Sequence, residues 1–139
     1  MTMSNRAVWD KFYADLEAID VDAVVDAFAD DGSYHDMPSP TDPTVGKEAI
    51  RQKLAAGLTR LVRCECRFTA IVEDGDRILG ERDETWHLAG GAKVDLPVMS
   101  IMEFENGKVT KLREYWDLQT ATRQLPSGAL DAPGSSSGA

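Results

Sequence analysis

Residues 78–88 read Ile78-Leu79-Gly80-Glu81-Arg82-Asp83-Glu84-Thr85-Trp86-His87-Leu88, and their alternation predicts a half-buried β-strand. Its even-numbered face is apolar except for two charged residues, and its odd-numbered face is mostly polar. Alternate side chains leave a strand on the same side, so Arg82 and Glu84 both project into apolar surroundings. An ionised group in such surroundings must be paired or must have its pKa shifted. This strand therefore predicts buried charges.

A second segment, Thr110-Lys111-Leu112-Arg113-Glu114-Tyr115-Trp116-Asp117-Leu118, alternates in the same way and places Glu114 on its apolar face. We expect Arg82 to contact both Glu84 and Glu114, because the fork of guanidinium donors can bridge two carboxylates. One arginine between two carboxylates in an apolar cavity indicates acid–base chemistry. The alternative is a buried network of structural ion pairs, since perturbed carboxylates mark functional sites only statistically.

Ahead of these segments, apolar residues at helical spacing predict three helices. The predicted helices cover residues 4–19, 21–29 and 47–58. Ser4 and Asp20 stand where they can cap the first two helices. A short strand over residues 33–36 and a proline-rich loop over residues 37–43 are expected between the second helix and the third.

From residue 62 onward the pattern changes to the period of two that predicts strands. The predicted strands cover residues 62–73, 77–88, 93–105 and 108–120. Glycine-containing turns join them, and Asn106-Gly107 is the strongest hairpin signal in the chain. Pro97 within the third of these strands indicates a bulge or an edge position, because proline cannot donate to the strand ladder.

Three helices followed by a long antiparallel meander predict an α+β architecture, in which a curved sheet wraps the helices and leaves a hollow for a small molecule. With 139 residues, of which 42% are hydrophobic and 28% charged, the chain fits one globular domain. We place that domain at residues 1–123. Residues 124–139 are rich in glycine, serine and alanine, and they predict a flexible tail.

The charge balance argues against two classes of partner. The formal net charge is −9, and no cluster of basic residues occurs. Nucleic acids and anionic membrane surfaces both require concentrated lysine and arginine, so neither is expected as a partner. There is also no signal-peptide pattern, and no apolar run approaches the roughly 20 residues of a membrane-spanning helix. We therefore expect a cytoplasmic protein.

The two cysteines, Cys64 and Cys66, share one face of a predicted strand. A zinc site would need further cysteine or histidine ligands at suitable spacing, and the two histidines, His35 and His87, form no such pattern with them. The cysteines are interpreted as core residues, and no metal is predicted.

In the order of their predicted helices and strands, residues 5–122 resemble the NTF2-like superfamily. The fold of this superfamily is a cone-shaped α+β barrel. Within it the chain is most similar to the limonene-1,2-epoxide hydrolases. That family has a Tyr-x-Asn-Met-Pro-x-Pro stretch, a Glu-Arg-x-Asp strand and an Arg-Asp-Tyr-aromatic-Asp-Leu strand. The matching segments here are Tyr34-His35-Asp36-Met37-Pro38-Ser39-Pro40, Glu81-Arg82-Asp83-Glu84 and Arg113-Glu114-Tyr115-Trp116-Asp117-Leu118.

The resemblance implies an enzyme that adds water to the epoxide of a hydrophobic small molecule. It assigns water activation to Glu114, proton donation to Glu84, and the holding of both carboxylates to Arg82. Tyr34 would help to position the water. Both glutamates replace aspartates of that family, and Asp36 replaces an asparagine. Asp36 adds a third carboxylate near one arginine, so at least one of the three is expected to hold a proton near neutral pH.

Other functions of the same superfamily stay open. Ketosteroid isomerases have a general-base aspartate at the position of Asp36, but their oxyanion-hole tyrosine and aspartate correspond here to Phe12 and Ser100. Tyr13, next to Phe12, is expected to face elsewhere. SnoaL-like polyketide cyclases and epoxide-opening ether cyclases also use acidic residues on this fold. A domain that binds a small molecule without catalysis is a further alternative.

The remaining expectations concern the pocket and the assembly. We expect the pocket walls to include Trp86, Trp116, Met102, Ser100 and Phe12. No cofactor is expected, because acid–base assistance is sufficient to open a strained ring. The resemblance also implies a homodimer formed through the outer face of the sheet.

Overall fold

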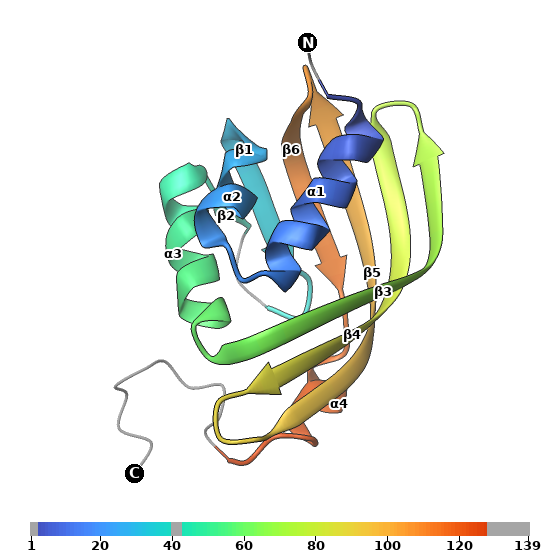
Figure 1. Cartoon of the computed structure of the whole chain (residues 1–139). Coiled ribbons are helices and arrows are strands. Elements are labelled where there is room, and N and C mark those ends of the chain that lie inside the picture. The colour runs from blue at the N-terminus through green and yellow to red at the C-terminus, as the bar shows by residue number, and fades with distance from the viewer. Residues whose placement is uncertain (1–2, 40–42, 128–139) are drawn as a thin grey trace.

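The helices at the start of the chain lie in the hollow of a strongly curved sheet (Figure 1). This computed structural model describes residues 3–39 and 43–127. Residues 40–42 of the proline-rich loop and residues 128–139 of the predicted tail lie outside the described residues. Gln124, the first residue of that tail, is fixed to the sheet, because its side chain donates to Asp95 O and accepts from Asp95 N, both at 2.9 Å.

Helices and strands follow one another in the predicted order. The helices are α1 (Asn5–Glu17), α2 (Val21–Asp26), α3 (Lys47–Leu58) and α4 (Leu118–Thr122). The strands are β1 (Phe28–Asp36), β2 (Thr44–Val45), β3 (Leu61–Asp74), β4 (Arg77–Leu88), β5 (Lys93–Glu105) and β6 (Lys108–Tyr115). Both predicted caps are confirmed: the side chains of Ser4 and Asp20 accept from the backbone N–H groups of Ala7 and Ala23.

The six strands form one mixed sheet in the order β2-β1-β6-β5-β4-β3. The meander from β3 to β6 is antiparallel, as expected, but β1 runs parallel to β6. The predicted antiparallel meander is thus confirmed, and β1 adds a parallel pairing beside β6 that the sequence did not indicate. Parallel neighbours need a long crossover connection, and here α3 and three long strands supply it.

Several elements differ from the predicted ones in their boundaries or were not predicted. The second helix ends at Asp26 and the first strand begins at Phe28, where residues 33–36 alone were expected. The two-residue strand β2 was not expected. The last strand ends at Tyr115, because the Asp117 carboxylate accepts from the N–H and the hydroxyl of Thr120 and so begins α4.

Pro97 lies in the first part of β5, residues 93–98, which pairs with β4 alone and so forms an edge of the sheet. It pairs with Asp83 on β4, whereas the pairing of β5 with β6 begins two residues later, between Met99 and Tyr115. Pro97 therefore lies where β5 has no β6 neighbour, and its missing N–H costs no ladder hydrogen bond.

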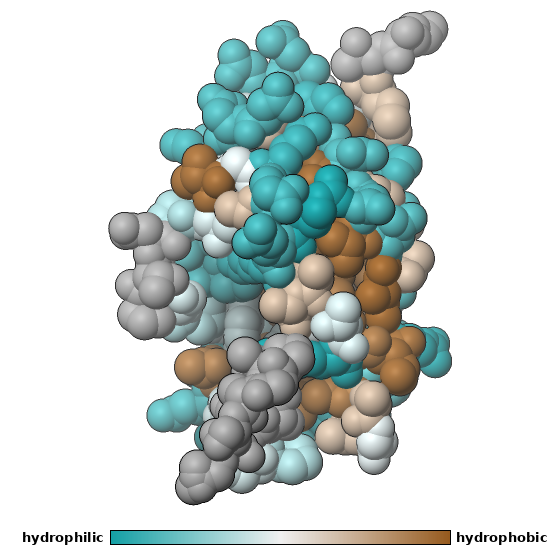
Figure 2. Space-filling view, turned by 90° about the vertical axis from the view of Figure 1, so that its left-hand side faces the viewer, coloured by the Kyte–Doolittle hydropathy of each residue, from teal (hydrophilic) through white to brown (hydrophobic). Residues whose placement is uncertain are grey.

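Hydrophilic and hydrophobic residues are unevenly distributed over the surface. On the side of α3, hydrophilic residues cover the upper part of the face and hydrophobic residues gather in its lower right-hand part (Figure 2). On the outward face of the sheet, the exposed side chains of Met99 and Tyr115 lie in register on neighbouring strands. Among the described residues, no helix has the length and hydrophobicity that crossing a membrane requires.

Trp9 joins α1 to the sheet. Its side chain is 1% exposed, and its ring centroid lies 5.4 Å from that of Phe68 on β3. It rests on Gly80 of β4, where an added Cβ would lie 2.5 Å from Trp9 Cζ2. Gly80 is required here because only a residue without a side chain allows this approach.

We predict that Gly80→Ala destabilises the fold by about 1–3 kcal/mol, the usual cost of overpacking a core. Gly57→Ala is the matched control, since a Cβ at Gly57 meets nothing within 4 Å and Gly57 lies in α3. This control should gain up to about 1 kcal/mol from helix propensity. Urea unfolding of both variants tests the pair. Equal stability of Gly80→Ala and the unmodified protein would contradict the role given to Trp9.

Candidate functional site

Arg82 lies at the centre of a buried polar cluster. Its Nε donates to Glu84 Oε1 at 3.0 Å, its Nη1 to Ser100 Oγ at 2.6 Å, and its Nη2 to Glu114 Oε2 at 2.6 Å. The side chain is 1% exposed, and both carboxylates are also buried. The predicted contacts of Arg82 with Glu84 and Glu114 are thus confirmed. The three partners come from β4, β5 and β6, so one guanidinium connects three adjacent strands.

Glu114 accepts hydrogen bonds on both of its oxygens. Tyr34 OH donates to Oε1 at 2.6 Å, while Arg82, the Ser100 hydroxyl and Tyr13 OH, the last at 3.3 Å, all donate to Oε2. Burial by itself raises the pKa of Glu114, but Arg82 and the hydroxyl donors outweigh burial and lower this pKa below its ordinary value of 4.5. Glu114 is therefore held as a carboxylate.

The position of Tyr13 differs from the prediction. Its ring packs under the guanidinium of Arg82, with Cζ 4.7 Å from the ring centroid, and burial raises the pKa of its hydroxyl well above 10.0. The reason is that α1 buries a broad stripe that includes both Phe12 and Tyr13. Helical spacing could have found this residue, because Tyr13 follows the buried Trp9 by one turn.

Glu84 is held by donors on both oxygens. Besides Arg82, the Cys66 thiol donates to Oε1 at 3.3 Å and the indole N–H of Trp86 donates to Oε2 at 2.8 Å. Cys66 remains a thiol, because Cys64, burial and the negative charge of Glu84 all raise its pKa. Glu84 thus shares its surroundings with two cysteines that the sequence placed in the core.

Asp36 forms an ion pair with a different cation, Lys53. Lys53 Nζ on α3 lies 3.2 Å from Asp36 Oδ2, and the indole N–H of Trp116 donates to Oδ1 at 3.1 Å. Burial raises the pKa of Asp36 above 3.8, with a further contribution from the charge of Glu114, although Lys53 acts in the opposite direction. Asp36 thus has an ion pair of its own with Lys53, while it lies opposite Glu114 in the pairing of β1 with β6 and lines the same cavity as Arg82.

The sequence reasoning missed Lys53. Ile50, Leu54 and Leu58 form the buried stripe of α3, and Lys53 lies at the edge of that stripe, where the residue as a whole is exposed. Its ammonium group also lies 4.3 Å from the centroid of the Tyr34 ring. A lysine beside the apolar stripe of a helix was the signal that could have identified it.

A cavity of about 200 Å³ is lined both by the cluster around Arg82 and by the ion pair of Asp36 with Lys53. Its polar lining consists mainly of Tyr34, Asp36, Lys53, Arg82, Glu84 and Glu114. Its apolar lining includes Leu16, Leu54, Leu58, Leu61, Leu88 and Val98. A mostly apolar hollow with a few convergent polar groups is typical of a site for a small molecule.

Of the residues predicted to form the pocket walls, Trp86 and Trp116 do line the cavity. Phe12 and Met102 do not, because both pack within the main hydrophobic core on the side of α1. Ser100 is completely buried behind Arg82, to which it is hydrogen-bonded. The apolar face of β5 thus fills the core at one end and reaches the cavity at Val98.

The lowered pKa of Glu114 predicts a stability change in acid. Between this lowered value and 4.5 the unfolded chain binds the proton and the folded chain does not, so stability rises with pH there. The stabilisation is complete above 4.5 and is lost as the pH falls through the folded-state value. Glu114→Gln should reduce the slope of unfolding free energy against pH by up to about 1.4 kcal/mol per pH unit.

Urea unfolding from neutral pH down to the acid transition measures this slope. Glu103→Gln is the control, because Glu103 also has a lowered pKa but its pair with Arg113 is partly exposed. We expect a smaller change of slope for this variant. If the slope is the same in Glu114→Gln and in the unmodified protein, the pKa of Glu114 is not lowered by folding.

Comparison with known proteins places the chain in a family with several activities. An LEH-like epoxide hydrolase from M. tuberculosis is similar at 24% identity, with a TM-score of 0.75 over 89% of this chain and 90% of that one. A protein assigned as a SnoaL-like polyketide cyclase from Shewanella denitrificans OS-217 is 13% identical, with a TM-score of 0.79 over 86% of this chain and 95% of that one.

A hypothetical protein with a ketosteroid isomerase-like fold from Catenulispora acidiphila DSM 44928, in complex with trimethylamine, is 20% identical. Its TM-score is 0.76, over 86% of this chain and 93% of that one. These likenesses confirm the NTF2-like fold and leave the activity open. Residues 9–112 match the SnoaL-like domain family, which covers most of the chain. The chain therefore belongs to the SnoaL-like domain family.

Proposed function

We propose that this protein opens the epoxide of a hydrophobic small molecule by adding water. The observation that carries the proposal is the contact of one buried arginine with two carboxylates that line an apolar cavity. The resemblance of these residues to the motifs of limonene-1,2-epoxide hydrolases supports it. The cavity of about 200 Å³ has mostly apolar walls, and because ligand sites usually measure about 300–1,000 Å³ it favours a substrate at the small end of that class.

In this mechanism Glu114 removes a proton from a water molecule. Its Oε1 accepts from Tyr34 alone among the described residues, whereas its Oε2 accepts three hydrogen bonds, so Oε1 is the oxygen available to the water. As the water oxygen bonds to an epoxide carbon, the carbon–oxygen bond breaks. Glu84 gives a proton to the leaving oxygen, and the diol forms. The proton on Glu114 then returns to Glu84 through solvent, which restores the enzyme.

The charges around the cavity support a stored proton. Arg82 and Lys53 provide two positive charges, and the three carboxylates provide three negative charges when ionised. One proton on any of the three carboxylates brings the net charge of these five residues to zero. A net charge of zero is favoured in poorly solvated surroundings, so one carboxylate is expected to be protonated. The proposed mechanism puts that proton on Glu84, and Asp36 lines the same cavity.

We predict that Glu114→Gln and Glu84→Gln each lower turnover by about 10²–10⁴-fold, the usual value of general acid or base assistance. Tyr34→Phe should cost less, because other groups can help to position the water. Glu103→Gln, on the outward side of the sheet, is the matched control and should keep full turnover. The measurement is initial rate on an epoxide panel, with circular dichroism to verify folding.

Isotopically labelled water distinguishes the possible reactions on the same panel. Label in a diol product is the expected result. An unlabelled cyclic ether from a hydroxy-epoxide would identify a cyclase instead. The absence of turnover from the whole panel would favour an isomerase or a domain that binds without catalysis. If both glutamine variants unfold, the cluster is a structural ion-pair network.

A second candidate function has one specific observation in its favour. Asp36 lines the cavity with a raised pKa, and the resemblance implies a neutral asparagine at this position in the hydrolases. A carboxyl group with a raised pKa is suited to general acid–base catalysis. Asp36 would then transfer protons within a substrate, as in an isomerase or a cyclase, and water addition would not occur.

Asp36→Asn separates the two candidates. If Asp36 only positions water, this variant should lose less than about 10²-fold in turnover, the lower limit for removal of a general acid or base. A greater loss would assign the chemistry to Asp36.

The dependence of rate on pH gives an independent measurement. If Asp36 must donate a proton, activity falls as the pH rises through its raised pKa, and Asp36→Asn removes this decline. Lys53→Met should move the decline to higher pH, because Lys53 lowers the pKa of Asp36. A decline that stays in place in both variants belongs to another group.

A further inference from the structure

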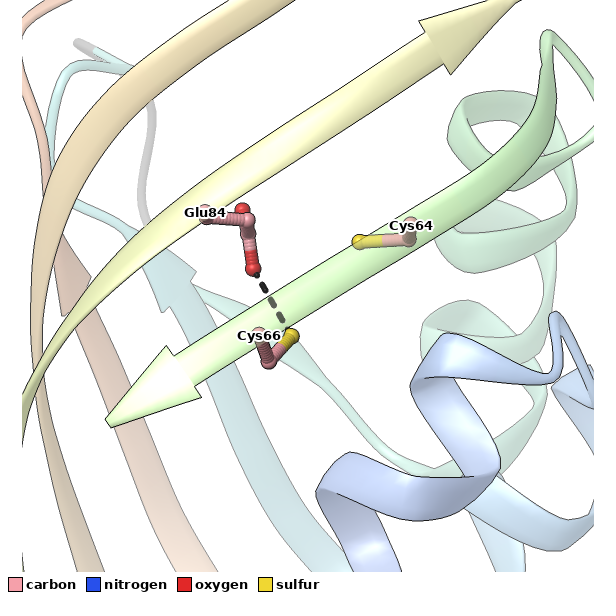
Figure 3. A group of neighbouring side chains, drawn as sticks. All are labelled: Cys64, Cys66 and Glu84. Carbon is pink, nitrogen blue, oxygen red and sulfur yellow. Dashed lines mark hydrogen bonds between the residues drawn. The ribbon is translucent and has the colours of Figure 1, made fainter.

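Three potential metal ligands converge beside the cavity. Cys64 and Cys66 project from β3, Glu84 projects from the neighbouring strand β4, and the three side chains point toward one another (Figure 3). Their two sulfur atoms and a carboxylate oxygen all lie within 4.8 Å of one another. The spacing of cysteines and histidines along the chain indicated no such site, because the third ligand comes from another strand.

The register of the sheet explains this convergence. Cys66 lies opposite Glu84, and Cys64 lies opposite Trp86, one pair further along the same face. Residues two apart on a strand share a face, so the three side chains point to the same side of the sheet. Their positions are therefore fixed by backbone pairing and not by flexible loops.

The distances are close to those of a tetrahedral metal site. With zinc–sulfur bonds of about 2.3 Å and zinc–oxygen bonds of about 2.0–2.2 Å, two ligand atoms on one ion stand roughly 3.5–3.8 Å apart. The Cys66 sulfur already lies 3.3 Å from Glu84 Oε1, and no separation in the cluster exceeds the tetrahedral spacing by more than about 1.3 Å. Cys64 and Glu84 also line the cavity, which gives an ion an entry path.

Charge and hydrogen bonding favour a divalent cation here. Two thiolates and one carboxylate carry three negative charges; the ion cancels two of them, and Arg82 shares its positive charge between Glu84 and Glu114. Arg82 and Trp86 both donate to the Glu84 carboxylate, and hydrogen bonds of this kind orient the carboxylates that ligate metals. Two sulfur ligands select a thiophilic ion, such as zinc or cadmium, over magnesium or calcium.

We infer that Cys64, Cys66 and Glu84 form a binding site for one thiophilic divalent cation, with its fourth coordination position open to the cavity. Binding converts both thiols to thiolates and releases their two protons to solvent. The inference does not depend on the proposed function. If both are correct, the ion engages the carboxylate that donates the proton, and an occupied site stops epoxide opening.

Cadmium chloride titrated into the full-length reduced protein tests the inference without any substrate. The expected result is a thiolate-to-cadmium charge-transfer absorption that saturates at one ion per chain, with release of about two protons per ion in weak buffer from the thiols, and of a third where Glu84 holds the stored proton. Cys64 and Cys66 are the only cysteines in the sequence, so this absorption reports on them alone. Zinc should compete for the same site.

Variants assign the ligands. Cys64→Ser and Cys66→Ser should each abolish saturable binding at one ion per chain, with folding verified by circular dichroism. Because Cys64 is buried, Cys64→Ala provides a second variant if the serine disturbs the core. Glu84→Gln should weaken binding by at least about 10–100-fold, the range reported for the outer-shell partners of metal ligands. His87→Ala is the matched control, since His87 pairs with Glu65 instead, and binding should not change.

Three results would overturn the inference. The first is the absence of the charge-transfer absorption at cadmium concentrations that saturate ordinary thiolate sites. The second is saturation at one ion per two chains, which would mean that cysteines of two molecules share the ion. The third is unchanged affinity in Glu84→Gln, which would remove the carboxylate from the site. None of these results bears on the proposed epoxide chemistry.

Discussion

The fold depends on the hydrogen bonds and ion pairs that compensate the buried guanidinium of Arg82. Arg82 donates to Glu84, Ser100 and Glu114, which lie on three adjacent strands. Burying these charges costs much of what their attraction returns, so the arrangement is stable only while every partner is present. Removing one partner would leave an uncompensated charge in the core, which typically costs about 3–5 kcal/mol. The register of β4, β5 and β6 must therefore keep these residues together.

The packing of the helices completes this constraint. Tyr13 on α1 covers one side of Arg82 and donates to Glu114, while Trp9 can reach the sheet only because Gly80 has no side chain. These contacts exclude water from one side of the ion-pair cluster, and electrostatic interactions are stronger in a medium of low dielectric constant. On the other side the cavity leaves the carboxylates accessible. The same cluster is thus structurally fixed and chemically accessible.

Within a fold that supports many activities, function is decided by particular side chains. This chain has longer carboxylates than the resemblance implies for the hydrolases, and it adds the pair of Asp36 with Lys53. That pair puts a second titrating group in the cavity, so the identity of the proton donor becomes the question that separates hydrolase from cyclase or isomerase. The homodimer implied by the resemblance stays a prediction, for which the paired exposed side chains of Met99 and Tyr115 provide a candidate surface.

The sequence by itself determined which residues share a strand face, and so it predicted the contacts of Arg82 with Glu84 and Glu114. Such predictions succeed because the periods of helices and strands are local properties of the chain. Only the tertiary structure decided that β1 lies parallel to β6, that Tyr13 reaches Glu114, and that Asp36 pairs with Lys53. Tyr13 and Glu114 are 101 positions apart, and no local pattern encodes their contact. Packing of α1 and α3 against the sheet brings such residues together, because each helix must bury its apolar stripe.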